Sequence, residues 1–154
     1  METNSNSRAP RSVRNNNPLN LRRNLIKWQG LASRQEDSEF CQFESPAWGW
    51  RAAFIVLTRT YYYKYHLNTL RKIINRWAPP NENTTSAYLN RVCEITHLNA
   101  DFPLPVVTMN PGMWLSIGYA MAIVEAGREP DVTAMLTGWD WAMTAHRYGT
   151  FGDK

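Results

Sequence analysis

Residues 113–124 are almost entirely apolar, and this stretch constrains the fold more than any other feature of the sequence. Asn110 and Pro111 before it are typical of a helix start, and Gly127 after it suits the left-handed conformation that ends many helices. On such a helix the apolar side chains cover nearly the whole circumference, and they are Met113, Trp114, Leu115, Ile117, Tyr119, Met121, Ile123 and Val124. Because a helix that is apolar all round must be buried, the sequence predicts a central helix with the rest of the chain packed around it.

Helical signals also predict amphipathic helices around this core. Their expected caps or first residues are Ser45, Thr69, Thr84 or Thr85, and Asp131. The first of them is the longest, because Pro46 suits the first helical turn and apolar residues recur at helical spacing to about His66. Pro79 and Pro80 end the second, since proline restricts the backbone and lacks a hydrogen-bond donor.

The N-terminal part of the chain has a different composition. Residues 1–13 contain almost nothing that could be buried, so we expect a flexible basic arm followed by a single domain over residues 14–154. Within that domain, the β-prone segments LRRNLIKW and SEFCQF flank a polar connection between residues 21 and 43. They predict a small β-hairpin flap near the N-terminus, which makes the expected fold class mainly α with a minor β part (α+β).

Length and composition exclude several classes of protein. A chain of 154 residues with 44% hydrophobic residues builds one core, and no segment reaches the roughly 18 consecutive apolar residues of a membrane span. We expect a soluble protein made in the cytoplasm without a Sec-type signal peptide, because the first residues lack an apolar region. Cys41 and Cys93 are isolated and expected to be free thiols, and the histidines lack zinc-type spacing, so we expect no metal and no cofactor.

Glu125 is the residue with the most distinctive placement. It lies at the end of the apolar helix, where burial and the negative end of the helix dipole both disfavour the charged carboxylate. A carboxyl that keeps its proton near neutral pH can protonate a glycosidic oxygen, the step that glycan cleavage requires. Glu125 is therefore a candidate general acid, and the alternative is a surface carboxylate paired with Arg128 in the last helical turn.

The candidate substrate contacts are amide and aromatic side chains. Sugar rings stack on aromatic faces and amides bind hydroxyl and N-acetyl groups, which points to four candidates for a carbohydrate cleft: Asn17, Asn20, Trp28 and Trp48. Each has an alternative role, because asparagine also forms turns and most aromatic residues here lie on inward helical faces. Glu44, in the predicted flap, is a candidate second carboxylate or water-orienting group, and the alternative is a charge that only solvates a loop.

Several segments together resemble one known protein family. They are RNNNPLNLR (14–22), KWQGL (27–31), FCQFESPAWGWRAA (40–53), LNTLRKIINRWAPPNENTTSAYLNRV (67–92) and MAIVEAGREP (121–130). Over these residues the chain is similar to the virion-associated, lytic-transglycosylase-like structural proteins of phages and prophages, and the RWAPP segment with the EN and Tyr that follow it is the most specific part. The resemblance implies a lysozyme-like helical domain that acts on, or binds, bacterial cell wall.

The order of these motifs differs from the wider lysozyme-like superfamily, in which a helix ending in Glu-Ser-Gly precedes the Asn-rich segment and the Thr-x-x-Tyr helix. Here MAIVEAG follows them, which indicates a circular permutation, and the alternative is that the catalytic helix has been lost. With a permutation, the resemblance implies a general acid/base role for Glu125. It also implies polar cleft contacts by Asn17 and Asn20 and a wall position for Tyr88. Ala126 stands where the superfamily has serine, and this difference bears on activity and not on the fold.

Two classes of function are consistent with these residues. The first is a virion-associated lytic transglycosylase or muramidase that cuts peptidoglycan between N-acetylmuramic acid and N-acetylglucosamine, with Glu125 protonating the leaving oxygen. The alternative is a non-enzymatic virion structural or cell-wall-binding protein of the same fold. In either class the basic N-terminal arm is a candidate contact to other virion proteins. Binding of nucleic acid through the arginines of residues 8–23 ranks last, because no recognised reader motif accompanies them.

Overall fold

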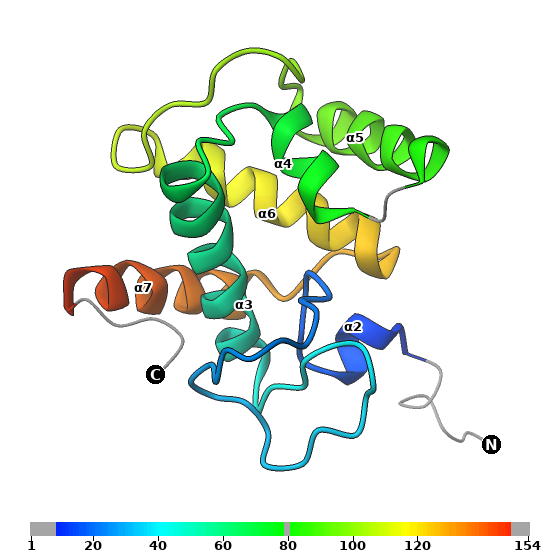
Figure 1. Ribbon diagram of the computed structural model, residues 1–154, viewed down its shortest axis with the longest axis vertical. Helices are drawn as coiled ribbons and strands as arrows, with labels where there is room; N and C mark the ends of the chain where they lie inside the picture. The colour runs from blue at the N-terminus through cyan, green and yellow to red at the C-terminus, as the bar shows by residue number, and fades with distance from the viewer. Residues whose placement is uncertain (1–8, 79–80, 149–154) are drawn as a thin grey trace.

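The chain is mainly helical, as the computed structural model in Figure 1 shows. The structure describes residues 9–78 and 81–148. Its helices are α2 (Arg11–Arg14), α3 (Pro46–Ile55), the π-helix η1 (Val56–Lys64), α4 (Leu70–Trp77), α5 (Glu82–Thr96), α6 (Pro111–Ala126) and α7 (Val132–Tyr148). The prediction of a mainly helical fold is confirmed.

Helix α6 is the central helix that the apolar stretch predicts. It runs through the middle of the molecule, with α4 and α5 on one side and α3 and α7 on the other (Figure 1). The Asn110 side chain caps its start by accepting a hydrogen bond from the Met113 amide at 3.1 Å, and Gly127 ends it with a φ of 72°. Its buried residues are Trp114, Ile117, Gly118, Ala120, Met121 and Ala122.

Helices α3 and α7 cross at very short range, because glycine lies at the point of contact. A Cβ atom added to Gly138 of α7 would lie 2.4 Å from the Cβ of Trp50 and 2.7 Å from the carbonyl oxygen of Ala47. Gly118 has the same role on α6, where an added Cβ would lie 2.7 Å from the Phe54 ring. The aromatic side chains of α3 therefore fill the space between α6 and α7.

The long helix predicted from Pro46 to about His66 changes type halfway. It is α-helical to Ile55 and continues as the π-helix η1 to Lys64. At the junction the Thr58 hydroxyl donates to the Phe54 carbonyl at 2.7 Å, a side-chain bond that competes with the α-helical backbone pattern. The apolar spacing of the sequence indicates a helix but does not reveal this local widening.

The predicted start of α5 at Thr84 or Thr85 is wrong by one turn. Asn81 is the cap, because its side-chain oxygen accepts a hydrogen bond from the Thr84 amide at 3.0 Å, which places Thr84 inside the first turn. The predicted Thr69 cap of α4 is confirmed, since the Thr69 hydroxyl accepts from the Lys72 amide at 3.2 Å. The two prolines predicted to separate these helices lie outside the described residues.

The predicted β-hairpin flap is also wrong. Residues 15–45, here called the N-terminal loop segment, are irregular, and in the described structure only isolated bridges join Arg22 to Phe40 and Leu31 to Phe43. Side chains take the place of a strand ladder. The Gln35 side chain bonds to the backbone of Gln42. Its side-chain oxygen accepts a hydrogen bond from the Gln42 backbone N–H at 2.9 Å, and its side-chain nitrogen donates to the Gln42 carbonyl at 2.7 Å. These bonds occupy backbone groups that a β-hairpin would have paired.

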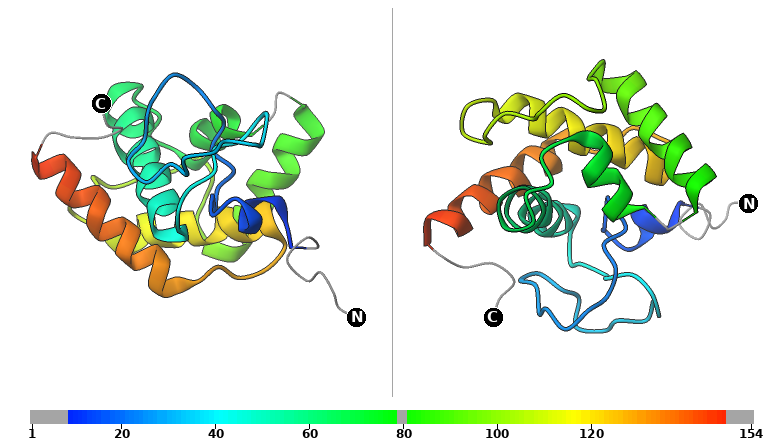
Figure 2. Two further views of the ribbon diagram at one scale, coloured as in Figure 1. Left: turned by 90° about the horizontal axis from the view of Figure 1, so that it is seen from below. Right: turned by 45° about the horizontal axis from the view of Figure 1, so that its top comes forward.

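The N-terminal loop segment lies at the end of the molecule opposite α5, which both Figure 1 and the right-hand view of Figure 2 show. Helix α2 precedes it and packs near α6. Of the predicted basic arm, residues 1–8 lie outside the described residues, whereas Ser12 is buried in α2. Cys41 and Cys93 are free thiols, as predicted.

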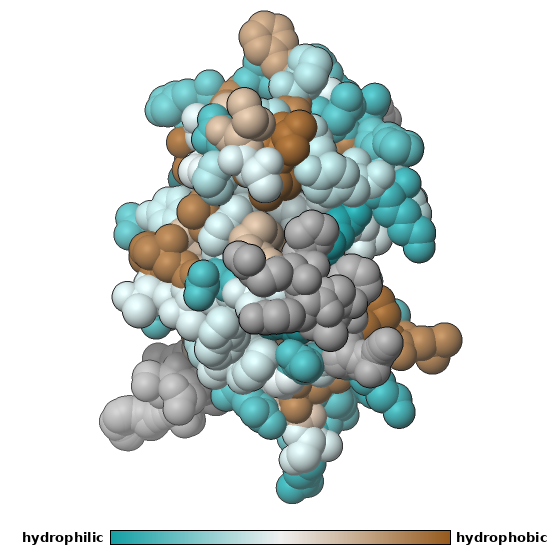
Figure 3. Space-filling model, turned by 90° about the vertical axis from the view of Figure 1, so that its left-hand side faces the viewer, coloured by the Kyte–Doolittle hydropathy of each residue, from teal (hydrophilic) through white to brown (hydrophobic). Residues whose placement is uncertain are grey.

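Exposed apolar side chains are spread over the surface. The most exposed are Leu25, Phe102 and Met109, which lie in loops. On the face shown in Figure 3, hydrophobic residues form separate spots among hydrophilic ones. Among the helices that the structure describes, none combines the length and the apolar character needed to cross a membrane.

Candidate functional site

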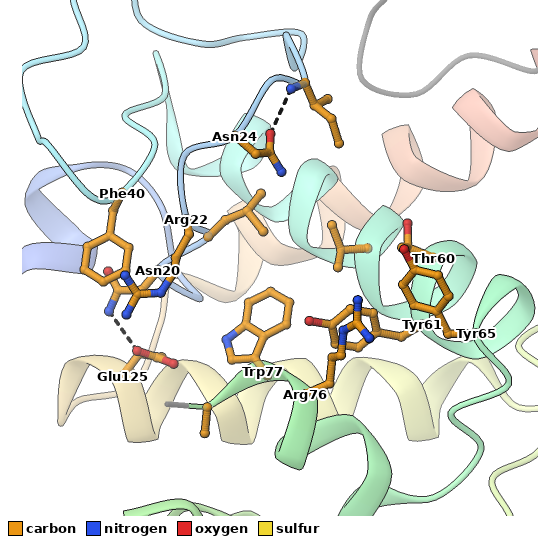
Figure 4. Close-up of a pocket in the computed structure, with 14 residues that line it drawn as sticks. Asn20, Arg22, Asn24, Phe40, Thr60, Tyr61, Tyr65, Arg76, Trp77 and Glu125 are labelled. Carbon is orange, nitrogen blue, oxygen red and sulfur yellow. Dashed lines mark hydrogen bonds between the residues drawn. The ribbon is translucent and has the colours of Figure 1, made fainter. Parts of the chain in front are cut away.

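A groove lies between the N-terminal loop segment and the helices that face it (Figure 4). Its volume is about 630 Å³, within the usual range of ligand-binding pockets. One wall comes from the loop segment, and the other comes from η1, the end of α4 and the last turn of α6. The lining residues are Asn20, Leu21, Arg22, Asn24, Ile26, Phe40, Val56, Thr60, Tyr61, Tyr65, Arg76, Trp77, Ala78 and Glu125.

Glu125 lies at one end of this groove, in the last turn of α6. Its Oε1 accepts a hydrogen bond from the Asn20 side-chain amide at 2.8 Å, which Figure 4 shows, and its Oε2 accepts one from the Tyr88 hydroxyl at 2.8 Å. The alternative role considered above, a surface ion pair with Arg128, is not formed among the described residues. The carboxyl is instead held by two neutral donors from distant parts of the chain.

The pKa of Glu125 is raised above its ordinary value of 4.5. Burial is the largest cause, because it penalises the charged carboxylate. The hydrogen bonds from Asn20 and Tyr88, contact with Trp77 and the charge of Arg22 act in the opposite direction and offset part of the effect. The net shift favours the protonated acid at a higher pH than an exposed glutamate would allow.

Asn20 reaches Glu125 because the backbone turns sharply around it. Its φ of 53° is in the left-handed region that asparagine tolerates, and its backbone N–H donates to the Asn17 carbonyl at 2.9 Å. The Oδ1 atom of Asn20 is buried and has no hydrogen-bond partner among the described residues. Since rotation of the amide exchanges its donor and acceptor ends, Asn20 can donate to an ionised Glu125 or accept from a protonated one.

Tyr88 approaches the same carboxyl from α5. It is 7% exposed, and its pKa is raised well above 10 by burial and by the neighbouring Glu125. The phenol therefore stays protonated and remains both a donor and an acceptor at every pH at which the protein is expected to be folded.

Trp77 forms the middle of the groove wall. Its indole N–H donates to the Leu19 carbonyl at 3.1 Å, which fixes the ring, and Tyr61 packs edge-on against it with 5.8 Å between ring centroids. In Figure 4 the indole lies between Glu125 on one side and Arg76 and Tyr61 on the other. The groove thus presents an acid, an aromatic wall and a cation in succession.

The predicted site residues separate into two groups. Glu125, Asn20 and Tyr88 meet at one point, although 105 residues of sequence separate the first two. The other four predicted contacts, which are Asn17, Trp28, Glu44 and Trp48, do not line the groove.

Each of these four has another place in the fold. Asn17 is fully buried, and its amide nitrogen donates to the Cys41 and Leu21 carbonyls at 2.8 and 3.0 Å, so it shapes the loop that carries Asn20. Trp28 is buried, Trp48 packs against Trp141 with 4.4 Å between ring centroids, and Glu44 is exposed.

The lining residues missed from the sequence include aromatic, cationic and neutral polar side chains of the groove walls. They are Arg22, Asn24, Phe40, Thr60, Tyr65, Arg76 and Trp77. Arg76 and Trp77 belong to the RWAPP segment that carried the family resemblance, and this was the available signal.

The described part of the site offers acid–base chemistry with a single carboxylate. Glu125 is the one acidic residue among the described residues that line the groove. Across the residues that the structure describes, no cluster of three or more His, Cys, Asp or Glu side chains could hold a metal ion. Glu125 is therefore the carboxyl group of the described lining that could give or accept a proton.

Comparison with known proteins identifies a phage relative. No protein-family model matches the sequence. The chain is 34% identical over 137 residues to Protein P5 of Pseudoalteromonas phage PM2, and the match covers 86% of this chain and 82% of Protein P5. Identity at this level over most of both chains indicates common descent, and the chain therefore belongs to the same family as Protein P5 of Pseudoalteromonas phage PM2.

Proposed function

We propose that this chain is a peptidoglycan lytic transglycosylase with Glu125 as its general acid and base. The observation that carries the proposal is a half-buried carboxyl with a raised pKa at one end of an aromatic-walled groove. Such a groove suits a polysaccharide, because sugar rings present apolar faces to aromatic walls and hydroxyl groups to amides.

In the proposed reaction, protonated Glu125 transfers its proton to the glycosidic oxygen as the bond from C1 of N-acetylmuramic acid to that oxygen breaks. The carboxylate then takes the proton of the C6 hydroxyl of the same sugar while that oxygen bonds to C1. The products are a 1,6-anhydromuramoyl end and a new N-acetylglucosamine end, and Glu125 regains its proton.

The absence of a second acid in the described groove lining favours this reaction over hydrolysis. Glycoside hydrolases ordinarily need a second carboxylate, as nucleophile or as the base that activates water. A transglycosylase needs one carboxyl that works twice. Ala126 supplies no hydroxyl beside Glu125, but the Tyr88 hydroxyl reaches the same carboxyl at 2.8 Å.

The family relationship supports a phage context for this activity, because the relative is a phage protein. We extend the proposal to association with a virion, where a cell-wall-cleaving protein would open the host envelope during entry. Residues 1–8 of the predicted basic arm, which would contact other virion proteins, lie outside the described residues.

The decisive experiment compares the wild type with Glu125→Gln on purified cell wall. We expect the wild type to clear a cell-wall suspension and to release anhydromuropeptides, which are one water lighter than reducing-end products by mass spectrometry. Glu125→Gln is expected to lose activity by a factor of about 100 or more, because glutamine cannot transfer the proton.

Glu44→Gln is the matched control, since Glu44 is exposed and lies outside the groove lining. It should clear cell wall as the wild type does. Equal clearing by Glu125→Gln and the wild type would exclude Glu125 from the reaction. Reducing ends in place of anhydro ends would indicate a hydrolase, and binding without any release by the wild type would indicate the non-enzymatic cell-wall-binding alternative.

A further inference from the structure

The end of the groove away from Glu125 holds a cation that the proposed reaction does not use. The guanidinium carbon of Arg76 lies 4.5 Å from the centre of the Tyr65 ring and 5.9 Å from that of Tyr61. Figure 4 shows these side chains together on the wall beyond Trp77. Contact with two aromatic faces restricts the guanidinium, so its N–H donors are held in place before any ligand arrives.

Arg76 also differs from Arg71 and Arg91, which each pair with an acidic side chain. Arg71 binds Asp101 at 2.7 Å, and Arg91 binds Glu94 at 2.7 Å. In the described structure no carboxylate lies within 4.0 Å of the Arg76 guanidinium. Its charge is therefore available to a ligand in the groove.

The groove as a whole has an excess of positive charge. Arg22 lies near Glu125, Arg76 lies at the far end, and the one acidic residue of the described lining is biased towards its neutral form. A neutral glycan gains nothing from this arrangement beyond the aromatic and amide contacts. A glycan with carboxylate groups gains a charge-assisted hydrogen bond, one of the stronger contacts available in water.

We propose that Arg76, with Tyr61 and Tyr65, forms a subsite for a carboxylate on the substituent of muramic acid. The inference rests on the proposed function, because it identifies which glycans the same groove accepts. Muramic acid carries its carboxylate on the lactyl group when the peptide has been removed, and on the peptide stem when the peptide is present. Arginine binds either carboxylate in the same bidentate way.

The test measures binding in the Glu125→Gln background, so that no ligand is cleaved. The probes for calorimetry are a neutral chitotetraose, a peptide-free muramic acid–glucosamine tetrasaccharide, and the same tetrasaccharide with its peptides. Adding Arg76→Gln is expected to weaken binding of one or both acidic tetrasaccharides about tenfold or more and to leave chitotetraose binding unchanged. The acidic probe with the larger loss identifies whether the lactyl or the peptide carboxylate occupies the subsite.

Two further variants separate charge from shape. Lys72→Gln removes an equal charge from the exposed face of α4 outside the groove lining, and it should change no affinity. Arg76→Lys keeps the charge but not the planar donor pair, and it should retain part of the preference for acidic glycans.

The opposing outcomes are distinct for the two proposals. Equal weakening of neutral and acidic binding by Arg76→Gln, or no weakening of either, would overturn the carboxylate subsite even if Glu125→Gln abolishes cleavage. Arg76→Gln could weaken the binding of acidic glycans alone while the wild type releases no product from cell wall. That result would support the subsite and contradict the transglycosylase proposal. Failure of every glycan probe to bind would overturn both.

Discussion

At the scale of single residues, the chain places one carboxyl in surroundings that act on its charge in opposite directions. Burial favours the protonated form of Glu125, while donors from Asn20 and Tyr88 favour the ionised form. Both neighbours can also act as acceptors, so neither protonation state leaves the carboxyl without a partner. In the proposed reaction Glu125 loses and regains a proton, and such neighbours would pair with it in both states.

The raised pKa of Glu125 predicts how stability depends on pH. The unfolded chain releases this proton near the ordinary value of 4.5, whereas the native state retains it to higher pH, so the native state loses relative stability as pH rises through that interval. Glu125→Gln removes the penalty, because an amide does not ionise. We therefore expect a higher Tm than that of the wild type at pH 7 and equal Tm values at pH 4.

Thermal unfolding of both proteins between pH 4 and pH 8 checks this expectation. Glu44→Gln supplies the comparison, since Glu44 is exposed and lies outside the groove lining. A Tm difference for Glu125→Gln that is constant over the same range would contradict a buried, pKa-shifted carboxyl.

At the scale of elements, the sequence predicted helices well where a cap and an apolar face coincide. Asn110, Gly127 and Thr69 end or begin their helices as expected. Prediction failed where side chains override the backbone pattern, as at the junction of α3 and η1, where the Thr58 hydroxyl takes a backbone carbonyl. It failed in the N-terminal loop segment for the same reason, because strand propensity does not register the bonds that the Asn17 and Gln42 side chains form with backbone groups.

Helix packing supplies a prediction at this scale. Gly138→Ala should destabilise the protein by about 1–2 kcal/mol, because overpacking at the crossing of α3 and α7 outweighs the better helix propensity of alanine. Gly112→Ala, in the first turn of α6, should instead stabilise by about 0.5–1 kcal/mol, since the atom nearest an added Cβ there is 3.7 Å away. Urea unfolding measures the change in the free energy of unfolding for both variants. A change of the same sign in the two would refute the close crossing of α3 and α7.

At the scale of the whole molecule, the site is assembled from four separate regions: the loop at Asn20, the aromatic wall of η1 and α4, Tyr88 of α5, and Glu125 of α6. The sequence alone pointed to Glu125 and to the two side chains that bond to its carboxyl, Asn20 and Tyr88, through an apolar helix and a family resemblance. It could not place Trp28 or Trp48 outside the groove, because aromatic residues in cores and in clefts follow the same spacing. Only the tertiary structure distinguishes these positions.

Arg11 of α2 forms ion pairs with Asp37 and Glu39 of the N-terminal loop segment, and the pair with Asp37 has the shorter distance, 2.7 Å against 2.9 Å. The Asp37 carboxylate accepts from Arg11 at 2.7 Å on each oxygen and from Asn15 at 2.9 Å, and these bonds, the Arg11 bond above all, hold the pKa of Asp37 well below its ordinary value of 3.8. Asp37→Asn should lower the Tm at pH 7 by about 5 °C, because two donors then face an amide.

The pH dependence of this effect has the opposite sign to that of Glu125. A carboxylate with a depressed pKa contributes its full stability above pH 4 and loses that contribution as pH falls through its native pKa. The Tm deficit of Asp37→Asn should therefore shrink below pH 4. A deficit that stays constant from pH 7 to pH 2 would show that the ion pair does not fix the loop segment.

The hydrogen bond between Asn20 and Glu125 has a consequence for how the protein is made. One partner is translated early and the other only after a further 105 residues have been joined. A ribosome that stops just before that point releases a fragment that contains the other lining residues of the groove but not Glu125. The activity proposed here would therefore arise only after synthesis has passed Glu125, so shorter translation products would lack it.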